Sequence, residues 1–393
     1  MNNNFNTKSI SILFGKLAIL CIVFGFYFTF LIEGFTGITS TRNIFLFLGV
    51  VFFLGKLIFN RKIIIQRDYF IYALLSIPIA CISIFFWYSL NEINVYISLI
   101  TSIIVIASDF NYFKKLVKNL SYLLLLLVIY EFLTKTYIFV VQRDTEFGTI
   151  VLDPKLFGGY SGIFRGKGLF EGPLALAQYA IGLAFLFRQD IKVLLIACAL
   201  AVFANGRLGM IICFAILGIY FMEKYGLFSF LRSKKGLKTL GIISISLLII
   251  GIFFIDEIAL ERLRDVINIA DTSNSARLFY WQEGVEIFFD YPFINKIVGN
   301  SGYYRHVVGN SAENGWLMLL LNNGIVGFLY YFTPLVVIAY MSIKLKTYHV
   351  MLIFLLFLCM MIQTFHLGAL ANLFYWLIIY SFFLELNRKT KHE

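Results

Sequence analysis

Long apolar runs dominate the hydrophobic pattern of this chain. A helix needs about 20 mainly apolar residues to cross the hydrocarbon core of a bilayer, and roughly twelve stretches meet or approach that length. They are residues 11–32, 43–59, 69–88, 92–108, 119–141, 173–188, 191–205, 208–223, 239–258, 324–343, 348–366 and 368–386. The pattern predicts an all-α, polytopic membrane bundle, with one membrane domain over residues 1–393.

Composition supports lipid as the main solvent of the chain. Hydrophobic residues make up 60% of the sequence and charged residues only 14%. A soluble domain usually carries about 25% charged residues, because its surface has to be solvated. A soluble globular protein is therefore excluded.

Lysine and arginine recur in short segments that all fall on one side of the predicted bundle. These segments are residues 61–67, 114–118, 188–192, 224–238, 344–346 and 388–391. Short basic loops stay in the cytoplasm, so that side is predicted to be cytoplasmic. The chain is expected to be a multi-pass protein of a bacterial inner membrane, with both termini in the cytoplasm. The net charge of +11 is then mostly loop charge, and no basic soluble domain points to nucleic acid.

Two longer segments, 142–172 and 259–323, are predicted to lie outside the cytoplasm, and only the second is large enough for a small folded unit. Within it, residues 275–290 place apolar side chains at helical spacing, which predicts an amphipathic helix on the outer surface. The apolar positions are Leu278, Trp281, Val285 and Phe288. Residues 313–322 are too short to span and predict a short helix at the membrane rim, ended by Asn323-Gly324.

Three outer arginines, Arg165, Arg207 and Arg277, are candidate anion-binding residues. The guanidinium group presents a fixed fork of donors that matches phosphate and pyrophosphate. The alternatives are ordinary loop charge and side chains that extend to lipid headgroups. Arg305, His306, Tyr303 and Asn314 are further candidates for substrate contact in the same outer loop.

Glu313 is the candidate general base, because it begins the short outer helix and is expected at the membrane surface. The alternative role is electrostatic, since a carboxylate stabilises a helix N-terminus. Glu131 and Lys135 are four residues apart on one predicted helix, and this spacing predicts an ion pair. The four histidines lack metal-ligand spacing, so no metal site is expected. No nucleotide-binding motif is present.

Three stretches together resemble the superfamily of O-antigen polymerases and O-antigen ligases. They are GIFRGKGLFEGPLALAQYA (162–180), ANGRLGMII (204–212), and SARLFYWQEGVEIFFDYPFINKIVGNSGYY followed by SAENGWLMLLLNNGIVGFLYY. The nearest match is Glu313-Asn314 followed, after nine residues, by Gly324 and then Gly327. Ligases of this superfamily carry histidine where this chain has Glu313, a departure that favours a polymerase.

The resemblance implies transfer of a growing glycan between two undecaprenyl-pyrophosphate-linked oligosaccharides, without metal or cofactor. The product would be O-antigen or a similar surface polysaccharide. Arg165, Arg207 and Arg277 match arginines of the family and would hold the pyrophosphate, while Glu313 would accept the proton of the acceptor hydroxyl. Besides the lipid-linked oligosaccharide and membrane lipid, a chain-length regulator is a candidate partner.

Two other functions stay open. An O-antigen ligase is the alternative within the same enzyme class. A flippase or transporter of lipid-linked glycans is the alternative from another class, and it would need polar residues deep in the bundle. The chain instead concentrates its polar residues in one outer loop, which favours the enzyme.

Overall fold

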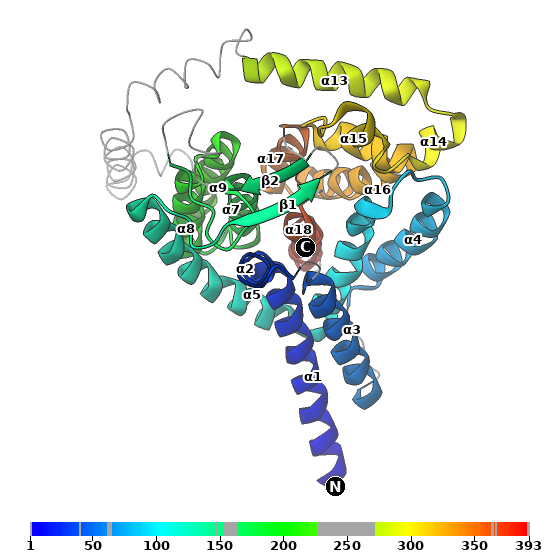
Figure 1. Ribbon diagram of the computed structural model, residues 1–393. Helices are drawn as coiled ribbons and strands as arrows, with labels where there is room; N and C mark the ends of the chain where they lie inside the picture. Colours follow the sequence, from blue (N-terminus) through cyan, green and yellow to red (C-terminus); the bar gives the residue numbers. More distant parts are fainter. Residues whose placement is uncertain are drawn as a thin grey trace.

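The computed structural model describes residues 2–38, 41–60, 65–145, 148–152, 164–226, 272–362, 365 and 368–390, and most of these residues are helical (Figure 1). The elements are α1 (Asn2–Tyr27), α2 (Thr29–Thr36), α3 (Thr41–Phe59), α4 (Arg67–Ile84), the 3-10 helix η1 (Leu90–Ile93), α5 (Asn94–Thr134), β1 (Val141–Thr145), β2 (Gly148–Leu152), α7 (Pro173–Leu186), α8 (Ile191–Phe203), α9 (Arg207–Tyr225), α13 (Thr272–Asp290), α14 (Phe293–Val298), α15 (Tyr303–Val308), α16 (Gly315–Lys344), α17 (His349–Ile362) and α18 (Ala369–Thr390).

Seven of the described helices are long and apolar enough to cross a membrane, so the chain is a helical membrane protein. Three shorter apolar helices, α7, α8 and α17, pack among them. The predicted spans 92–108 and 119–141 are joined in α5, whose helical geometry is interrupted at Asp109. The predicted span 239–258 lies outside the described residues, and the count of about twelve stays a prediction.

The segment predicted as an outer loop at 142–172 contains a short hairpin, which the all-α prediction missed. Strands β1 and β2 pair antiparallel, with Val141 opposite Leu152 and Thr145 opposite Gly148. Thr149, Ile150 and Val151 are β-branched residues, which favour extended backbone. The hairpin is short and lies between two longer apolar helices, so the hydrophobic pattern does not reveal it.

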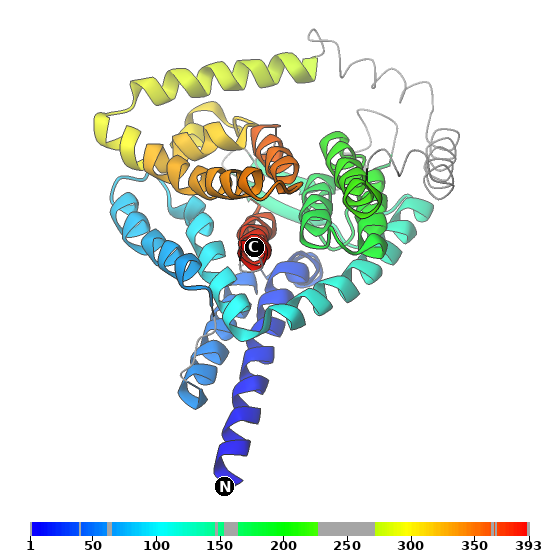
Figure 2. The same ribbon diagram turned by 180° about the vertical axis from the view of Figure 1, so that it is seen from behind.

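Helix α18 forms the centre of the bundle. It lies in the middle of the other helices in Figures 1 and 2 and packs against α5, α7 and α16. Its side chains Phe374, Tyr375 and Trp376 are fully buried. A helix that is apolar on every side is stable only where protein or lipid surrounds it, and here protein does so.

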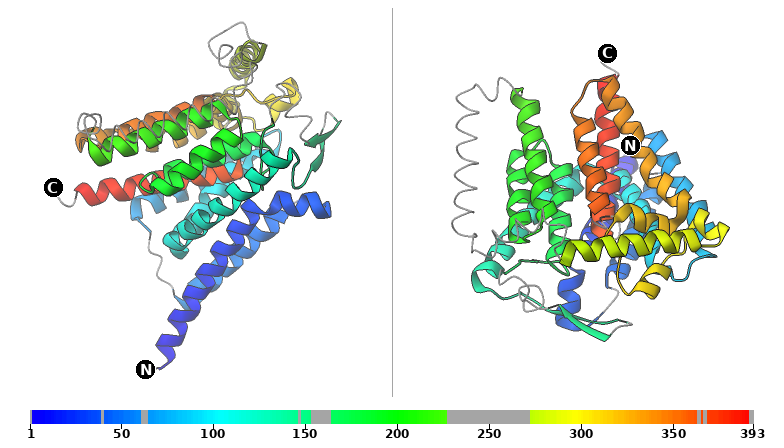
Figure 3. Two further views of the ribbon diagram at one scale, coloured as in Figure 1. Left: turned by 90° about the vertical axis from the view of Figure 1, so that its left-hand side faces the viewer. Right: turned by 90° about the horizontal axis from the view of Figure 1, so that it is seen from above.

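The two ends of the bundle differ in structure (Figure 3). Helix α13 lies across the direction of the spans at one end, where α14, α15 and the β1–β2 hairpin also lie, and both termini lie toward the other end. A second small core joins α13, α15 and the start of α16. It comprises Tyr291, Tyr304, Ala312, Leu317, Met318 and Leu321, with Trp281, Ile287, Phe288, Tyr303 and Val308 packed around them.

Helix α13 includes the predicted helix 275–290, and two of its four predicted apolar positions, Trp281 and Phe288, pack on the second small core. The other two, Leu278 and Val285, are exposed by 52% and 43%. A contact with α16 is made at Gly284, where an added Cβ would lie 2.8 Å from Leu317 Cδ2. A glycine lets two helices approach closely, so Gly284 allows α13 to lie directly against α16.

Candidate functional site

The structure pairs the candidate base with one of the candidate arginines. Arg277, in the first part of α13, donates from Nε to Glu313 Oε2 over 2.7 Å, across the junction between α13 and α16. Both side chains are part exposed, at 39% and 38%. The pair therefore lies at the surface of the protein, beside the second small core, and is accessible to a ligand.

Glu313 directly precedes α16 but is not the residue that caps it. Asn314 is the N-cap of α16, and its Oδ1 accepts a hydrogen bond from the Leu317 amide over 3.1 Å. Glu313 itself has φ +51°, in the left-handed region that non-glycine residues rarely adopt. Such strained backbone is concentrated at functional sites, and the cap at Asn314 leaves the carboxylate of Glu313 to Arg277.

Helix α16 is interrupted at Gly324, where the sequence predicts the end of the short helix 313–322. Gly324 has φ +65°, and an added Cβ would lie 2.3 Å from the carbonyl oxygen of Ile297. At the same place, Asn300 donates its amide to the Leu321 carbonyl over 2.9 Å. The residues from Trp316 to Leu319 are buried, so this short helix is covered by protein, and its predicted place at the membrane rim stays a prediction.

Arg165 and Arg207 are brought to one turn, between α8 and α9. Arg165 donates from Nε to the Ala204 carbonyl over 3.0 Å, and the Gly166 amide donates to Phe203 over 2.9 Å. Arg207 begins α9 three residues later and is exposed. The predicted arginines thus form two groups at the end of the bundle that carries α13: one at this turn, the other between α13 and α16.

The buried carboxylate of Glu131 holds the segment that follows Arg165, although the sequence predicts a pair between Glu131 and Lys135. Glu131 is fully buried, and its Oε2 accepts the amides of Lys167 and Gly168 over 2.9 and 2.8 Å. The predicted pair with Lys135 is wrong, since Lys135 Nζ lies 3.7 Å from the centroid of the Phe132 ring. The Gly-Lys-Gly sequence at 166–168 is the feature of the sequence that could have indicated this contact. Glycine is needed there because Gly168 has φ +56° and lies directly against Leu124.

Lys167 is the second buried charge of this segment. Its side chain is fully buried, with Nζ 3.4 Å from the centroid of the Phe139 ring. Burial lowers the pKa of Lys167 to about 8, although Glu131 and Glu171 act in the opposite direction. The lysine faces aromatic rings rather than solvent, so it supports the fold of this segment and is no candidate for contact with substrate.

The third set of candidates lies on α15. Arg305 and His306 are exposed, and the His306 ring stacks on Tyr88 with centroids 4.6 Å apart. Tyr303 packs edge-on against Tyr88 and Tyr291. The histidine is thus held by an aromatic contact between α15 and the segment after α4.

No group of three or more potential metal ligands is present in the described part of the chain. Comparison with known protein families and with curated proteins found no match. The chemistry available at the site is that of a part-exposed carboxylate paired with an arginine, with a second pair of arginines at the same end of the bundle.

Proposed function

We propose that this protein is a membrane glycosyltransferase that polymerises undecaprenyl-pyrophosphate-linked repeat units into O-antigen or a similar surface polysaccharide. Its site is on the outer face of the bacterial inner membrane, with both termini in the cytoplasm. The observation that carries the proposal is the Arg277–Glu313 pair, in which the carboxylate of a residue with a strained backbone lies beside an arginine side chain.

In the proposed reaction, a hydroxyl oxygen of the acceptor sugar attacks the anomeric carbon of the donor glycan. The bond from that carbon to the pyrophosphate oxygen breaks, and undecaprenyl pyrophosphate leaves with the bonding electrons. Glu313 accepts the proton of the hydroxyl. Arg277, Arg165 and Arg207 stabilise the negative charge of the leaving group.

The half-exposed geometry of the pair suits this role. A pyrophosphate group offers more acceptor oxygens than a carboxylate and binds guanidinium in a bidentate manner. The substrate would therefore compete with Glu313 for Arg277, and it would free the carboxylate to act as a base when the site is filled.

The decisive experiment deletes the gene in its host and resolves the surface polysaccharide on a gel. Lipid A-core that carries a single repeat unit supports a polymerase, because ligation and transport then continue without polymerisation. Complete loss of repeat units would indicate the ligase or the flippase instead. An unchanged ladder would contradict the proposal for this polymer.

Complementation then tests the site. Glu313→Gln is expected to lower polymer formation by about 10²–10⁴-fold, the contribution typical of a general base. Arg165→Ala is expected to shorten or abolish the ladder at wild-type expression. Glu286→Gln is the matched control, because Glu286 is exposed on α13 and bonds only its neighbour Gln282 among the described contacts. A wild-type ladder with Glu313→Gln would disprove the role of this carboxylate.

A further inference from the structure

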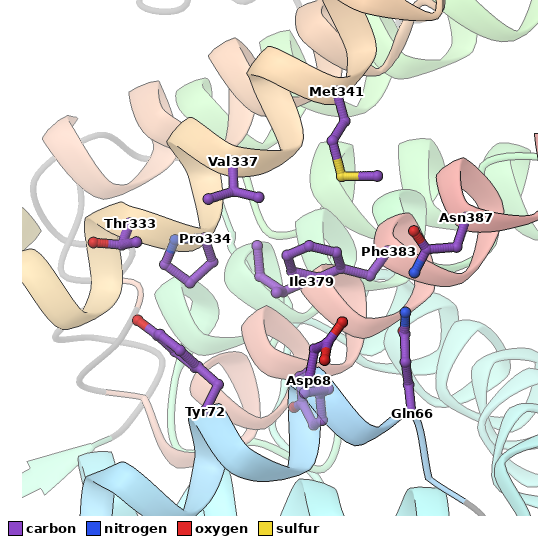
Figure 4. Close-up of a pocket in the computed structure, with 11 residues that line it drawn as sticks. Gln66, Asp68, Tyr72, Thr333, Pro334, Val337, Met341, Ile379, Phe383 and Asn387 are labelled. Atoms are coloured by element: carbon purple, nitrogen blue, oxygen red, sulfur yellow. The ribbon is translucent and has the colours of Figure 1, made fainter. Parts of the chain in front are cut away.

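A cavity of about 300 Å³ lies between α4, α16 and α18, away from the candidate site (Figure 4). Its walls are mainly apolar, with Pro334, Val337 and Ile379 among them. Gln66, Asp68 and Asn387 line its other side, and Figure 4 shows them together, away from Thr333 and Tyr72. Asn387 lies in the last turn of α18, so the polar side is at the end of the bundle that carries the termini.

The inner wall of this cavity is built around Pro334. A proline within a helix leaves the carbonyl four residues earlier without its amide donor. Here that carbonyl belongs to Tyr330, and the hydroxyl of Tyr72 donates to it. Tyr330 donates in return to the Tyr72 carbonyl over 2.6 Å, and the two rings stack at 4.5 Å. The contact ties α4 to α16 and leaves the space beyond Pro334 unfilled.

The cavity opens sideways between α4 and α16. Val337, on its wall, is 39% exposed although it lies in a helix long enough to cross a membrane. The medium at that depth is hydrocarbon, so the molecule with direct access is a lipid. The volume is at the lower end of the range of about 300–1,000 Å³ found for small-ligand pockets, which is enough for part of an acyl chain.

The polar side of the cavity carries acceptor oxygens on Gln66, Asp68 and Asn387, together with the amide N–H groups of Gln66 and Asn387. Gln66 Oε1 is buried and has no hydrogen-bond partner among the described residues, and the Asp68 side chain is exposed. A buried acceptor without a partner is unfavourable, so a ligand with N–H groups would satisfy it. The Asp68 carboxylate is complementary to an ammonium group, and Arg67, its neighbour in sequence, is an exposed cation that matches a phosphate.

We propose that this cavity binds an aminophospholipid of the phosphatidylethanolamine type. One acyl chain lies along Pro334, Val337 and Ile379, and the ammonium group is held by Asp68 and Gln66. The site is at the opposite end of the bundle from the Arg277–Glu313 pair and does not depend on the proposed reaction.

The chain contains a matched control surface. A groove of about 550 Å³ between α9 and α17 is lined only by apolar side chains and glycine, including Ile219, Met222 and Phe354. It offers room for an acyl chain without any polar group to select a headgroup. A lipid bound there should show no preference between headgroups.

The test is native mass spectrometry of the purified full-length protein, titrated with phosphatidylethanolamine or phosphatidylglycerol of identical acyl chains. We expect about tenfold tighter binding of phosphatidylethanolamine, the effect of one hydrogen bond to a charged group. Asp68→Asn should remove this preference, and Val337→Trp should abolish the selective site. Ile219→Trp, in the control groove, should leave the preference unchanged.

Two results would overturn the proposal. One is equal or tighter binding of phosphatidylglycerol by the wild-type protein. The other is a tenfold preference that persists in Asp68→Asn, a substitution at an exposed position that leaves the fold intact.

Discussion

An arginine–glutamate pair lies at each end of the bundle, and the two pairs are built differently. At the end that carries the termini, Arg188 pairs with Glu385 and is only 4% exposed. It also lies 2.9 Å from His349 Nε2 and over the Phe382 ring. At the other end, Arg277 and Glu313 are each more than a third exposed.

The buried Arg188–Glu385 pair is therefore structural, whereas the Arg277–Glu313 pair is accessible to a ligand. Arg188 follows α7, His349 begins α17 and Glu385 lies in α18, so the buried cluster joins three helices. Removing Glu385 would leave Arg188 buried without its carboxylate partner, and removing Arg188 would leave Glu385 with His349, 3.2 Å away. A half-exposed pair loses little when it opens, so Arg277 can exchange Glu313 for an anionic ligand.

The largest effect on stability is expected from Arg188→Ala. The substitution leaves Glu385 with His349 but without its main partner. Breaking a fully buried ion pair costs about 3–5 kcal/mol, and because Glu385 is 26% exposed the loss is expected at the lower end of this range. Thermal unfolding in detergent, followed by size-exclusion chromatography, measures the loss. Arg388→Ala is the control, because Arg388 is an exposed arginine near the same end of α18. Equal unfolding temperatures for the two variants would show that burial of Arg188 does not stabilise the protein.

A smaller effect is expected from Glu131→Ala, at the same end as the candidate site. The change leaves the amides of Lys167 and Gly168 without an acceptor, at about 1–3 kcal/mol for a buried unsatisfied group. Glu131→Gln keeps an oxygen for both amides and should retain more than half of the stability that alanine removes. The polymer ladder should shorten in proportion, because the anchored segment positions Arg165. If glutamine and alanine were equally harmful, the charge rather than the hydrogen bonds would be the stabilising feature.

The sequence was sufficient to predict features that depend on local pattern. Apolar runs located most helices, and Asn323-Gly324 marked the break in α16, because only a residue such as glycine readily takes φ +65°. Features that depend on distant partners could not be predicted. Glu131 bonds amides 36 and 37 residues away instead of Lys135.

The same limit applies to the buried pair and to the packed face of α13. Arg188 and Glu385 are 197 residues apart in sequence, so no spacing rule relates them. On α13, periodicity identifies Trp281 and Phe288, which pack on the second small core, but it does not distinguish them from Leu278 and Val285, which are exposed.

The smallest effect on stability, and the sharpest test of the comparison, is expected from Arg277→Ala. Part-exposed ion pairs contribute about 0–1 kcal/mol, so the unfolding temperature should stay close to that of the wild type. The polymer ladder should nevertheless be lost, as with Glu313→Gln. The double variant should be no less active than the worse single variant, because residues that act as a unit in catalysis are not additive. A fall in stability as large as that of Arg188→Ala, with the ladder retained, would place both pairs among the structural contacts and leave the protein without its proposed base.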